Sequence, residues 1–248
     1  MFKEYFDRIF LLNLVENKNR RDFMFSQFNQ LGCNDEVEVH NAVLHPFCDI
    51  IINAFNKSGK GKFTKPNEFN CAREHYSIIK QAYEEGANRV MVMEDDLCLL
   101  QDKEKLKEYL ENLPDDFDIL QMSCITPYKN IVNILKDNLR SKNPKYWMLH
   151  EETPMWGAAM YVLNRRGMVF YMKCQDQLYQ VADMPLYLTS INHKVVTSYI
   201  SSIPLGIQEN IKVIHSDIRQ GEHMNGQVEN YYEHKIDRTK YFSYSSNK

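Results

Sequence analysis

Hydrophobic and polar residues follow one another along this chain in blocks that predict strands separated by helices. Short apolar or alternating runs predict strands at residues 8–14, 36–43, 89–93, 116–123, 145–150, 158–163 and 194–200. Apolar residues at helical spacing predict helices at residues 17–32, 67–87, 102–112, 164–174 and 182–192. This alternation is typical of a single α/β domain with a mostly parallel sheet flanked by helices, which binds ligands at the carboxyl ends of its strands.

Three segments lack a clear period. Residues 45–67 contain the basic stretch KSGKGKFTK, which is either a solvated loop or a mobile lid over an anionic ligand. A long polar connection with a marginal helix runs to about Pro144. The last 25 or so residues are polar and rich in Tyr, so we expect one domain over residues 1–225 and an extended or mobile tail over 226–248.

Composition narrows the class of protein. The chain of 248 residues is 44% hydrophobic and 25% charged, which is ordinary for a globular protein with a buried core. A net charge of −3 argues against a general nucleic-acid binder. No apolar run approaches the roughly 18 residues that span a bilayer, and charged residues interrupt the N-terminal run, which argues against a signal peptide. We therefore expect a soluble, cytoplasmic protein that could still act at a membrane surface.

The six cysteines predict reduced, buried thiols, since none of them forms a CxxC pair. Cys71 and His75 lie one helical turn apart in the predicted helix 67–87 and could share a metal ion. No second pair completes four ligands, so the spacing argues against a zinc site.

The stretch VMVMEDDLCLL, residues 90–100, places Glu94, Asp95 and Asp96 between two apolar runs at the carboxyl end of a predicted strand. Adjacent carboxylates repel each other and are costly to desolvate, and a divalent cation removes that repulsion. Oxygen-only ligands favour Mg²⁺ or Mn²⁺ over zinc, and such ions are usually held by carboxylates together with substrate phosphates. A solvent-exposed acidic turn is the alternative, which the flanking apolar runs disfavour.

Several segments, in the same order, resemble glycosyltransferase family 25, the lipooligosaccharide galactosyltransferases and their collagen-modifying relatives. These segments are IFLLNLVENKNRR, HNAV, CAREH, VMVMEDDLCLL, WGAAMYVLNRRG, VADMPL and PLGIQENIKVIHSDI, and they run from about residue 8 to 218. The resemblance implies a GT-A-type transferase that inverts the configuration of the sugar. It also implies a UDP-sugar donor (galactose or glucose), a Mn²⁺ or Mg²⁺ ion at the diphosphate, and a glycan or a glycosylated or hydroxylated protein as acceptor.

The resemblance further implies roles for single residues near the metal ion and the donor. Asp96 becomes the direct metal ligand, Glu94 and Asp95 complete the metal shell or hold the ribose, and His215 is the candidate third ligand. Near the nucleotide, the resemblance implies Asn13, Arg20 or Arg21, and His75. His215 as a structural histidine and the arginine as a surface residue remain alternatives.

Four later residues complete the expected site. An inverting transfer needs one general base, and Asp183 fits by position, although a helix N-cap is an equal alternative. Trp156 and Gly157 are expected in the wall of the acceptor or sugar site, together with Asp217, and Trp156 could instead be a core residue.

The chain departs from the family pattern at two positions around Cys71 and His75. Asn70 stands where the family has Gly, and Glu74 stands where it has Ser, so the donor sugar could differ from the common one. The segment 45–67 is also unusual, so the acceptor could differ as well. A phosphoryl or nucleotidyl transferase and an inactive nucleotide-sugar-binding relative remain as alternatives. The absence of a GxxxxGK loop argues against a nucleoside triphosphatase.

Overall fold

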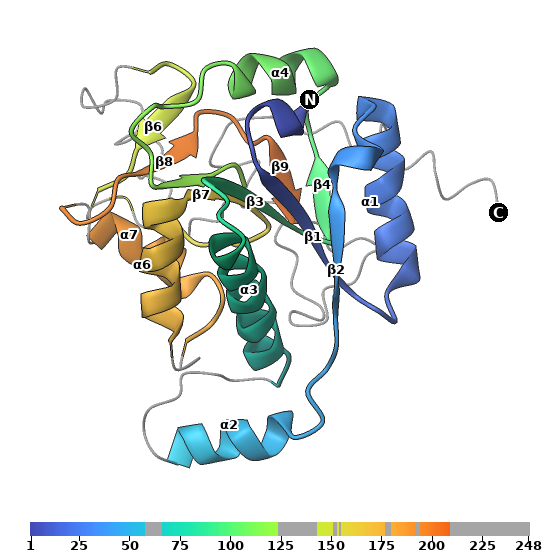
Figure 1. The fold of residues 1–248 in the computed structure, drawn as a ribbon, viewed down its shortest axis with the longest axis vertical. Helices are drawn as coiled ribbons and strands as arrows, with labels where there is room; N and C mark the ends of the chain where they lie inside the picture. Colours follow the sequence, from blue (N-terminus) through green and yellow to red (C-terminus); the bar gives the residue numbers. More distant parts are fainter. Residues whose placement is uncertain are drawn as a thin grey trace.

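The computed structural model describes residues 1–57, 66–123, 143–150, 153, 155–176, 180–191 and 194–208. In this part of the chain a seven-stranded sheet lies between helices, and a separate two-stranded sheet accompanies it (Figure 1). The predicted tail at 226–248 and most of the predicted connection before Pro144 lie outside the described residues.

Strands of the large sheet follow the order β2-β1-β3-β7-β5-β8-β6. Their bounds are β1 Arg8–Leu14, β2 Glu38–Ala42, β3 Arg89–Glu94, β5 Ile119–Gln121, β6 Tyr146–Met148, β7 Met160–Asn164 and β8 Ser198–Ser201. Strand β7 is antiparallel to both β3 and β5, and β6 is antiparallel to β8, whereas the remaining pairs are parallel. Strands β1, β2, β3, β5 and β8 therefore all point the same way, and only β6 and β7 of this sheet run opposite to them. This confirms the mostly parallel α/β sheet.

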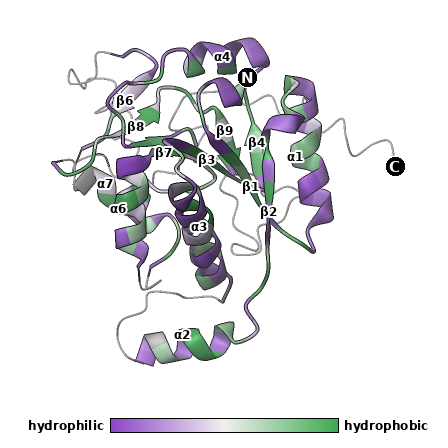
Figure 2. Ribbon diagram, viewed as in Figure 1, coloured by the Kyte–Doolittle hydropathy of each residue, from purple (hydrophilic) through white to green (hydrophobic). Residues whose placement is uncertain are grey.

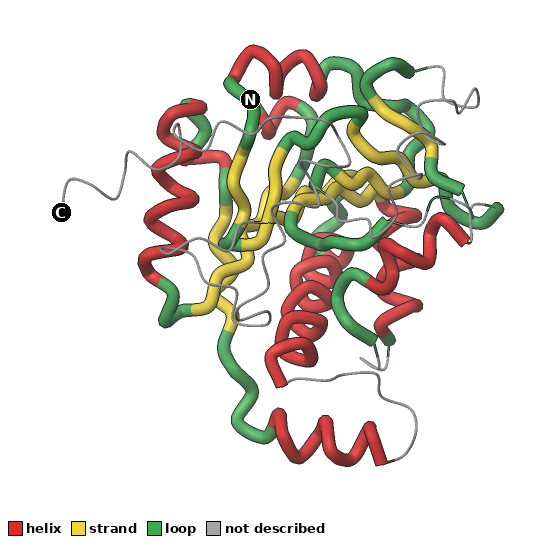
Figure 3. The backbone as a smooth tube through the Cα atoms, turned by 180° about the vertical axis from the view of Figure 1, so that it is seen from behind, coloured by secondary structure: helices red, strands yellow, loops and turns green. Residues whose placement is uncertain are grey.

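Helices cover both faces of the sheet. Their bounds are α1 Lys18–Leu31, α2 Cys48–Lys57, α3 Pro66–Glu84, α4 Lys103–Leu110, α6 Arg165–Gln175 and α7 Met184–Ile191, with short 3₁₀ turns at Phe2–Glu4 and Asn34–Glu36. Helices α3, α6 and α7 lie on one face, and α1 and α4 lie on the other, as the two opposite views show (Figure 1, Figure 3). None of the described helices has both the length and the apolar character needed to cross a membrane.

The central strands are apolar on both sides because each face of the sheet is covered. Along β1, Ile9 and Leu11 pack on the side of α1 and α4, while Phe10 packs on the side of α3 and α6. Met91 and Val92 of β3 divide between the two faces in the same way. Figure 2 shows hydrophobic residues along the central strands and hydrophilic residues on much of α1 and α4. A continuous apolar run therefore marks a strand buried on both faces.

The expectation of an aperiodic loop over residues 45–67 is wrong for its first half, because residues 48–57 form α2. Cys48 and Ile52 lie one turn apart and pack against Phe69 of α3, which buries one side of α2. The opposite side keeps Ile50 67% exposed, and Phe47, just before the helix, is 60% exposed. These exposed apolar residues obscured the helical period. Residues 58–65, with most of the basic stretch, lie outside the described residues.

Among the described cysteines, all are free thiols, as expected. Cys33, Cys48 and Cys98 are buried, but Cys71 and Cys174 are only partly buried. The expectation that the thiols are buried is therefore wrong for these two.

Helix α6 contains a glycine, Gly167, that its packing requires. A Cβ atom at this position would lie 2.0 Å from the backbone oxygen of Asp118, just before β5. The side chain of Asn164 caps the same turn by accepting a hydrogen bond of 2.9 Å from the Gly167 N–H. The close approach of helix and strand backbones explains why this helix forms with a residue of poor helix propensity.

Replacing Gly167 by alanine is predicted to destabilise the fold, although alanine favours helices by about 1 kcal/mol over glycine. The added methyl group must push α6 away from Asp118, and such overpacking costs about 1–3 kcal/mol. Urea unfolding measures the change. Lys173→Ala, on the exposed side of α6, is the matched control and is expected to change stability by less than about 0.5 kcal/mol. A stabilised Gly167→Ala protein would contradict this packing argument.

Candidate functional site

Parallel pairing of β1 and β3 brings the acidic run beside the end of the first strand. Leu12 lies opposite Glu94 in the register, so Asn13 and the carboxylates meet at the same edge of the sheet. Asp95 and Asp96 form the turn between β3 and the short strand β4 Leu97–Leu99. The carboxylates therefore lie where α/β sheets bind ligands.

A second pairing brings a residue from the end of the described chain to the same place. Strand β4 pairs antiparallel with β9 Gly206–Gln208, and Leu97 lies opposite Gln208. Because Leu97 directly follows Asp96, this register brings Gln208 beside Asp96, although the two are more than a hundred residues apart in sequence.

Asp95 is held from two sides and is only 5% exposed. Its Oδ1 pairs with Arg20 Nη1 at 2.7 Å, and its Oδ2 accepts a hydrogen bond of 2.7 Å from Asn13 Nδ2. Arg20 also reaches Asp96, with Nη2 at 3.3 Å from Oδ2. Both oxygens of Asp95 are thus engaged, so this carboxylate anchors the turn and is poorly placed to complete a metal shell.

Glu94 and Asp96 converge on the side chain of Gln208. The Gln208 Nε2 donates to Glu94 Oε2 at 3.0 Å and lies 3.2 and 3.1 Å from the two oxygens of Asp96. Three carboxylate oxygens thus surround one donor, and an oxygen-only set of this kind suits a hard divalent cation. The arrangement fits the metal role predicted for Glu94 and Asp96, which stays a prediction. His215 and Asp217 lie outside the described residues.

Sequence reasoning missed Gln208. The residue lies in the closing segment PLGIQENIKVIHSDI, in which the histidine drew attention because histidines are common metal ligands. The available signal was the short apolar run before Gln208, which forms β9 and places its last side chain at the acidic turn.

Burial gives the two converging carboxyl groups different pKa values. Burial and the neighbouring charge of Glu94 raise the pKa of Asp96 to about 8. Burial also acts to raise the pKa of Glu94, but the hydrogen bond and charge of His75, the charge of Arg20 and the contact with Cys71 together hold that pKa below its ordinary value. Near neutral pH Glu94 is therefore ionised and Asp96 is mostly protonated. A cation bound between the two groups must displace the Asp96 proton.

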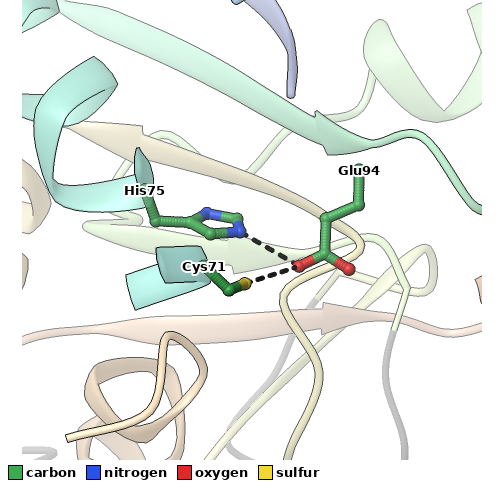
Figure 4. A group of neighbouring side chains, drawn as sticks. All are labelled: Cys71, His75 and Glu94. Carbon is green, nitrogen blue, oxygen red and sulfur yellow. Dashed lines mark hydrogen bonds and ion pairs between the residues drawn. The ribbon is translucent and has the colours of Figure 1, made fainter. Parts of the chain in front are cut away.

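Two side chains of α3 support Glu94 on its other side (Figure 4). Cys71 Sγ and His75 Nε2 both point at Glu94 Oε1, at 3.7 and 3.0 Å. His75 is fully buried, and its Nδ1 lies 2.8 Å from the hydroxyl of Tyr161. His75 therefore lies behind Glu94, as Asn13 lies behind Asp95, and neither is among the described residues that line the cleft. Their predicted contacts with the donor stay predictions.

An open cleft lies in front of these carboxylates and encloses about 620 Å³ when the open solvent at its mouth is included. The described residues that line it are Leu12, Leu14, Arg20, Ala42, Val43, Leu44, Asn67, Asn70, Cys71, Glu74, Glu94, Asp95, Asp96 and Gln208. Polar groups from β3, α1 and β9 thus face apolar residues that follow β2, a mixture suited to a ligand with a charged and an uncharged part. Of the two candidate arginines, Arg20 lies in the cleft, whereas Arg21 is not among its described lining residues.

The two departures from the family pattern both shape this cleft. Asn70 accepts a hydrogen bond of 2.8 Å from the backbone N–H of His45 and donates to Cys48 Sγ at 3.3 Å. Glu74 lies 2.7 Å from His40 Nε2 on β2. These contacts connect β2 and the segment that follows it to α3, and they hold two polar side chains in the lining of the cleft.

Asp183, Trp156 and Gly157 are not among the described residues that line the cleft, but two of them are linked through α7. The charge of Asp183 acts on the thiol of Cys71, which places this carboxylate near the cleft. The backbone carbonyl of Asp183 accepts a hydrogen bond of 3.0 Å from the N–H of Tyr187, as at a helix start. Trp156 stacks on Tyr187, with ring centroids 4.0 Å apart. The base and the N-cap therefore both remain open for Asp183.

Gly157 adopts a backbone conformation that favours glycine, with φ at 108°. Its carbonyl oxygen accepts a hydrogen bond of 3.3 Å from Gln121 Nε2 at the end of β5. This conformation accounts for the residue type without a ligand, so its place in a sugar-site wall stays a prediction.

Comparison with protein families identifies the chain. Residues 6–186 match the model of glycosyltransferase family 25, described as an LPS biosynthesis protein family, and the chain belongs to this family.

Relatives from bacteria and animals match shorter parts of the chain. It is 25% identical over 171 residues to human procollagen galactosyltransferase 2, covering 62% of this chain and 27% of that protein. It is 29% identical over 106 residues to the lacto-N-neotetraose biosynthesis glycosyltransferase LgtE of Neisseria meningitidis, covering 42% and 37%. It is also 25% identical over 125 residues to the inactive glycosyltransferase 25 family member 3 of Mus musculus, covering 48% and 21%. The matched segments span well under half the length of these relatives.

Among solved structures, apo mouse xyloside xylosyltransferase 1 aligns with a TM-score of 0.44 at 8% identity, covering 84% of this chain and 98% of that one.

Removing Arg20 is predicted to destabilise the protein far more than removing the adjacent Arg21. Arg20→Ala leaves Asp95 buried without its ion-pair partner, which costs about 3 kcal/mol or more. Arg21→Ala is the matched control, because Arg21 is only partly buried, and it is expected to cost less than about 0.5 kcal/mol. Urea unfolding in metal-free buffer compares the two variants. Equal losses would show that the Arg20–Asp95 pair does not hold the turn.

Proposed function

We propose that this protein is an inverting, divalent-cation-dependent glycosyltransferase that moves a hexose, galactose or glucose, from a UDP-sugar to a hydroxyl group. The acceptor is a glycan, as in lipopolysaccharide biosynthesis, or a protein side chain. The observation that carries the proposal is the convergence of Glu94 and Asp96 oxygens at an open cleft in a member of glycosyltransferase family 25.

Charge balance in the cleft supports the use of a divalent cation. Glu94, Asp95 and Asp96 together with Arg20 leave two formal negative charges when all are ionised. Bound Mn²⁺ or Mg²⁺ would neutralise the charge that develops on the leaving diphosphate. Glu94 and Asp96 would hold this ion, while Arg20 and Asn13 keep Asp95, and with it the turn, in place.

Inversion requires a base that takes the proton of the acceptor hydroxyl as the new glycosidic bond forms. Asp183 is our candidate, because it precedes α7 and its charge reaches Cys71, a residue that lines the cleft.

An inactive nucleotide-sugar-binding protein is the second candidate, since a mouse relative carries the word inactive in its name. The three carboxylates and their supporting residues favour turnover in this chain. A phosphoryl or nucleotidyl transferase would use the same carboxylates but would not release UDP from a UDP-sugar.

Nucleotide binding is measured by thermal shift with UDP, GDP, CMP and their sugars, with and without Mn²⁺. We expect a UDP-specific, Mn²⁺-dependent rise in melting temperature, because a ligand at 100 times its Kd stabilises the fold by about 2.7 kcal/mol. Asp96→Asn is expected to abolish the rise.

The rise should also be larger above about pH 8 than near neutral pH, because Mn²⁺ no longer has to displace a proton once Asp96 ionises at its raised pKa of about 8. A rise of equal size without metal would contradict the role of the cation.

A variant of Asp183 separates catalysis from binding. Asp183→Asn is expected to keep the UDP-dependent thermal shift but lower kcat by about 10²–10⁴, as loss of a general base does. Release of UDP in the presence of acceptor measures the rate. Asp176→Asn, an exposed aspartate at the end of α6, is the matched control and should keep full turnover. Loss of UDP binding in Asp183→Asn would mean that Asp183 serves as a helix cap.

A further inference from the structure

Cys71, His75 and Glu94 form a compact group of metal-ligating side chains, two of which line the cleft (Figure 4). One ligand atom from each, Cys71 Sγ, His75 Nε2 and a Glu94 oxygen, lies within 4.8 Å of the other two. The sequence spacing of Cys71 and His75 alone argues against zinc, because it supplies only two ligands. Tertiary structure supplies the third from the end of β3.

The distances in this group are close to those of tetrahedral zinc. Typical Zn–S, Zn–N and Zn–O bond lengths imply ligand separations of about 3.5 Å for S···O and about 3.3 Å for N···O. The structure has 3.7 Å from Cys71 Sγ to Glu94 Oε1 and 3.0 Å from His75 Nε2 to the same oxygen. Only the separation of Sγ and Nε2 has room to close, from at most 4.8 Å towards about 3.6 Å.

The other ring nitrogen of His75 has a partner of its own, because Nδ1 lies 2.8 Å from the hydroxyl of Tyr161. An outer hydrogen bond of this kind on Nδ1 is typical of a metal-binding histidine, and it leaves Nε2 directed at Glu94.

We propose that Cys71, His75 and Glu94 bind a borderline or soft divalent cation, Zn²⁺ first, at a site separate from the oxygen-only pair of Glu94 and Asp96. A thiolate and an imidazole select Zn²⁺ over Mg²⁺ or Mn²⁺, which prefer oxygen ligands. The thiolate and the carboxylate balance the two charges of the ion. Cys71 and Glu94 line the cleft, which gives the ion an entry path.

Glu94 lies between the two sites and offers each a different oxygen. Its Oε1 faces Cys71 and His75, whereas its Oε2 faces Gln208 beside Asp96. The zinc site therefore needs none of the atoms of Asp96, and it should survive changes at that residue.

The test uses the metal-free protein titrated with Co²⁺, which reports thiolate ligation through a charge-transfer band in the near ultraviolet. We expect one equivalent of Co²⁺ to produce the band and one equivalent of Zn²⁺ to remove it. Cys71→Ser should abolish the band and weaken Zn²⁺ binding by about tenfold or more. Cys174→Ser, a partly buried cysteine on α6, is the matched control and should keep the band.

Asp96→Asn separates this proposal from the proposed function. The variant should keep the cobalt band even where it loses the Mn²⁺-dependent response to UDP. Absence of the band in the unmodified protein, or its persistence in Cys71→Ser, would overturn the site. If Cys71→Ser does not fold, zinc-edge X-ray absorption of the unmodified protein decides the matter, because a zinc shell without sulfur also overturns it.

Discussion

The buried ion pair between Arg20 and Asp95 is the interaction on which the candidate site depends. It joins the first turn of α1 to the turn after β3, two segments that are 75 residues apart in sequence. A guanidinium with two fixed donors satisfies one oxygen of Asp95 and reaches Asp96, and Asn13 satisfies the other oxygen of Asp95. A buried carboxylate is costly unless it is paired in this way. The pair thus allows an acidic turn to exist inside an apolar fold.

With Asp95 held, its two neighbours are left to face other partners. Glu94 lies between α3 and β9, with one oxygen toward Cys71 and His75 and the other toward Gln208. Asp96 faces Gln208 and the cleft. Three consecutive carboxylates therefore have three different environments, which explains why burial raises the pKa of Asp96 while His75 keeps the pKa of Glu94 low.

The sequence predicted the α/β order well because burial on both sides of a sheet leaves continuous apolar runs, as in β1 and β3. It failed at α2, whose exposed apolar residues Phe47 and Ile50 conceal the period. Gly167 was expected within a helix, but the reason for the glycine, a backbone oxygen 2.0 Å from its absent Cβ, lies in another element. Local pattern thus reports how buried a residue is, and not what buries it.

For the site, the sequence by itself determined the acidic run, its place at a strand end and, through ordered short segments, the family. Only the tertiary structure distinguished Arg20 from Arg21, showed that Asp95 is already engaged, brought Gln208 to the carboxylates and gave Cys71 and His75 a third ligand. The physical reason is that each of these facts is a contact between side chains distant in sequence. Register and packing across the sheet create such contacts, and a single sequence carries no local signal of them.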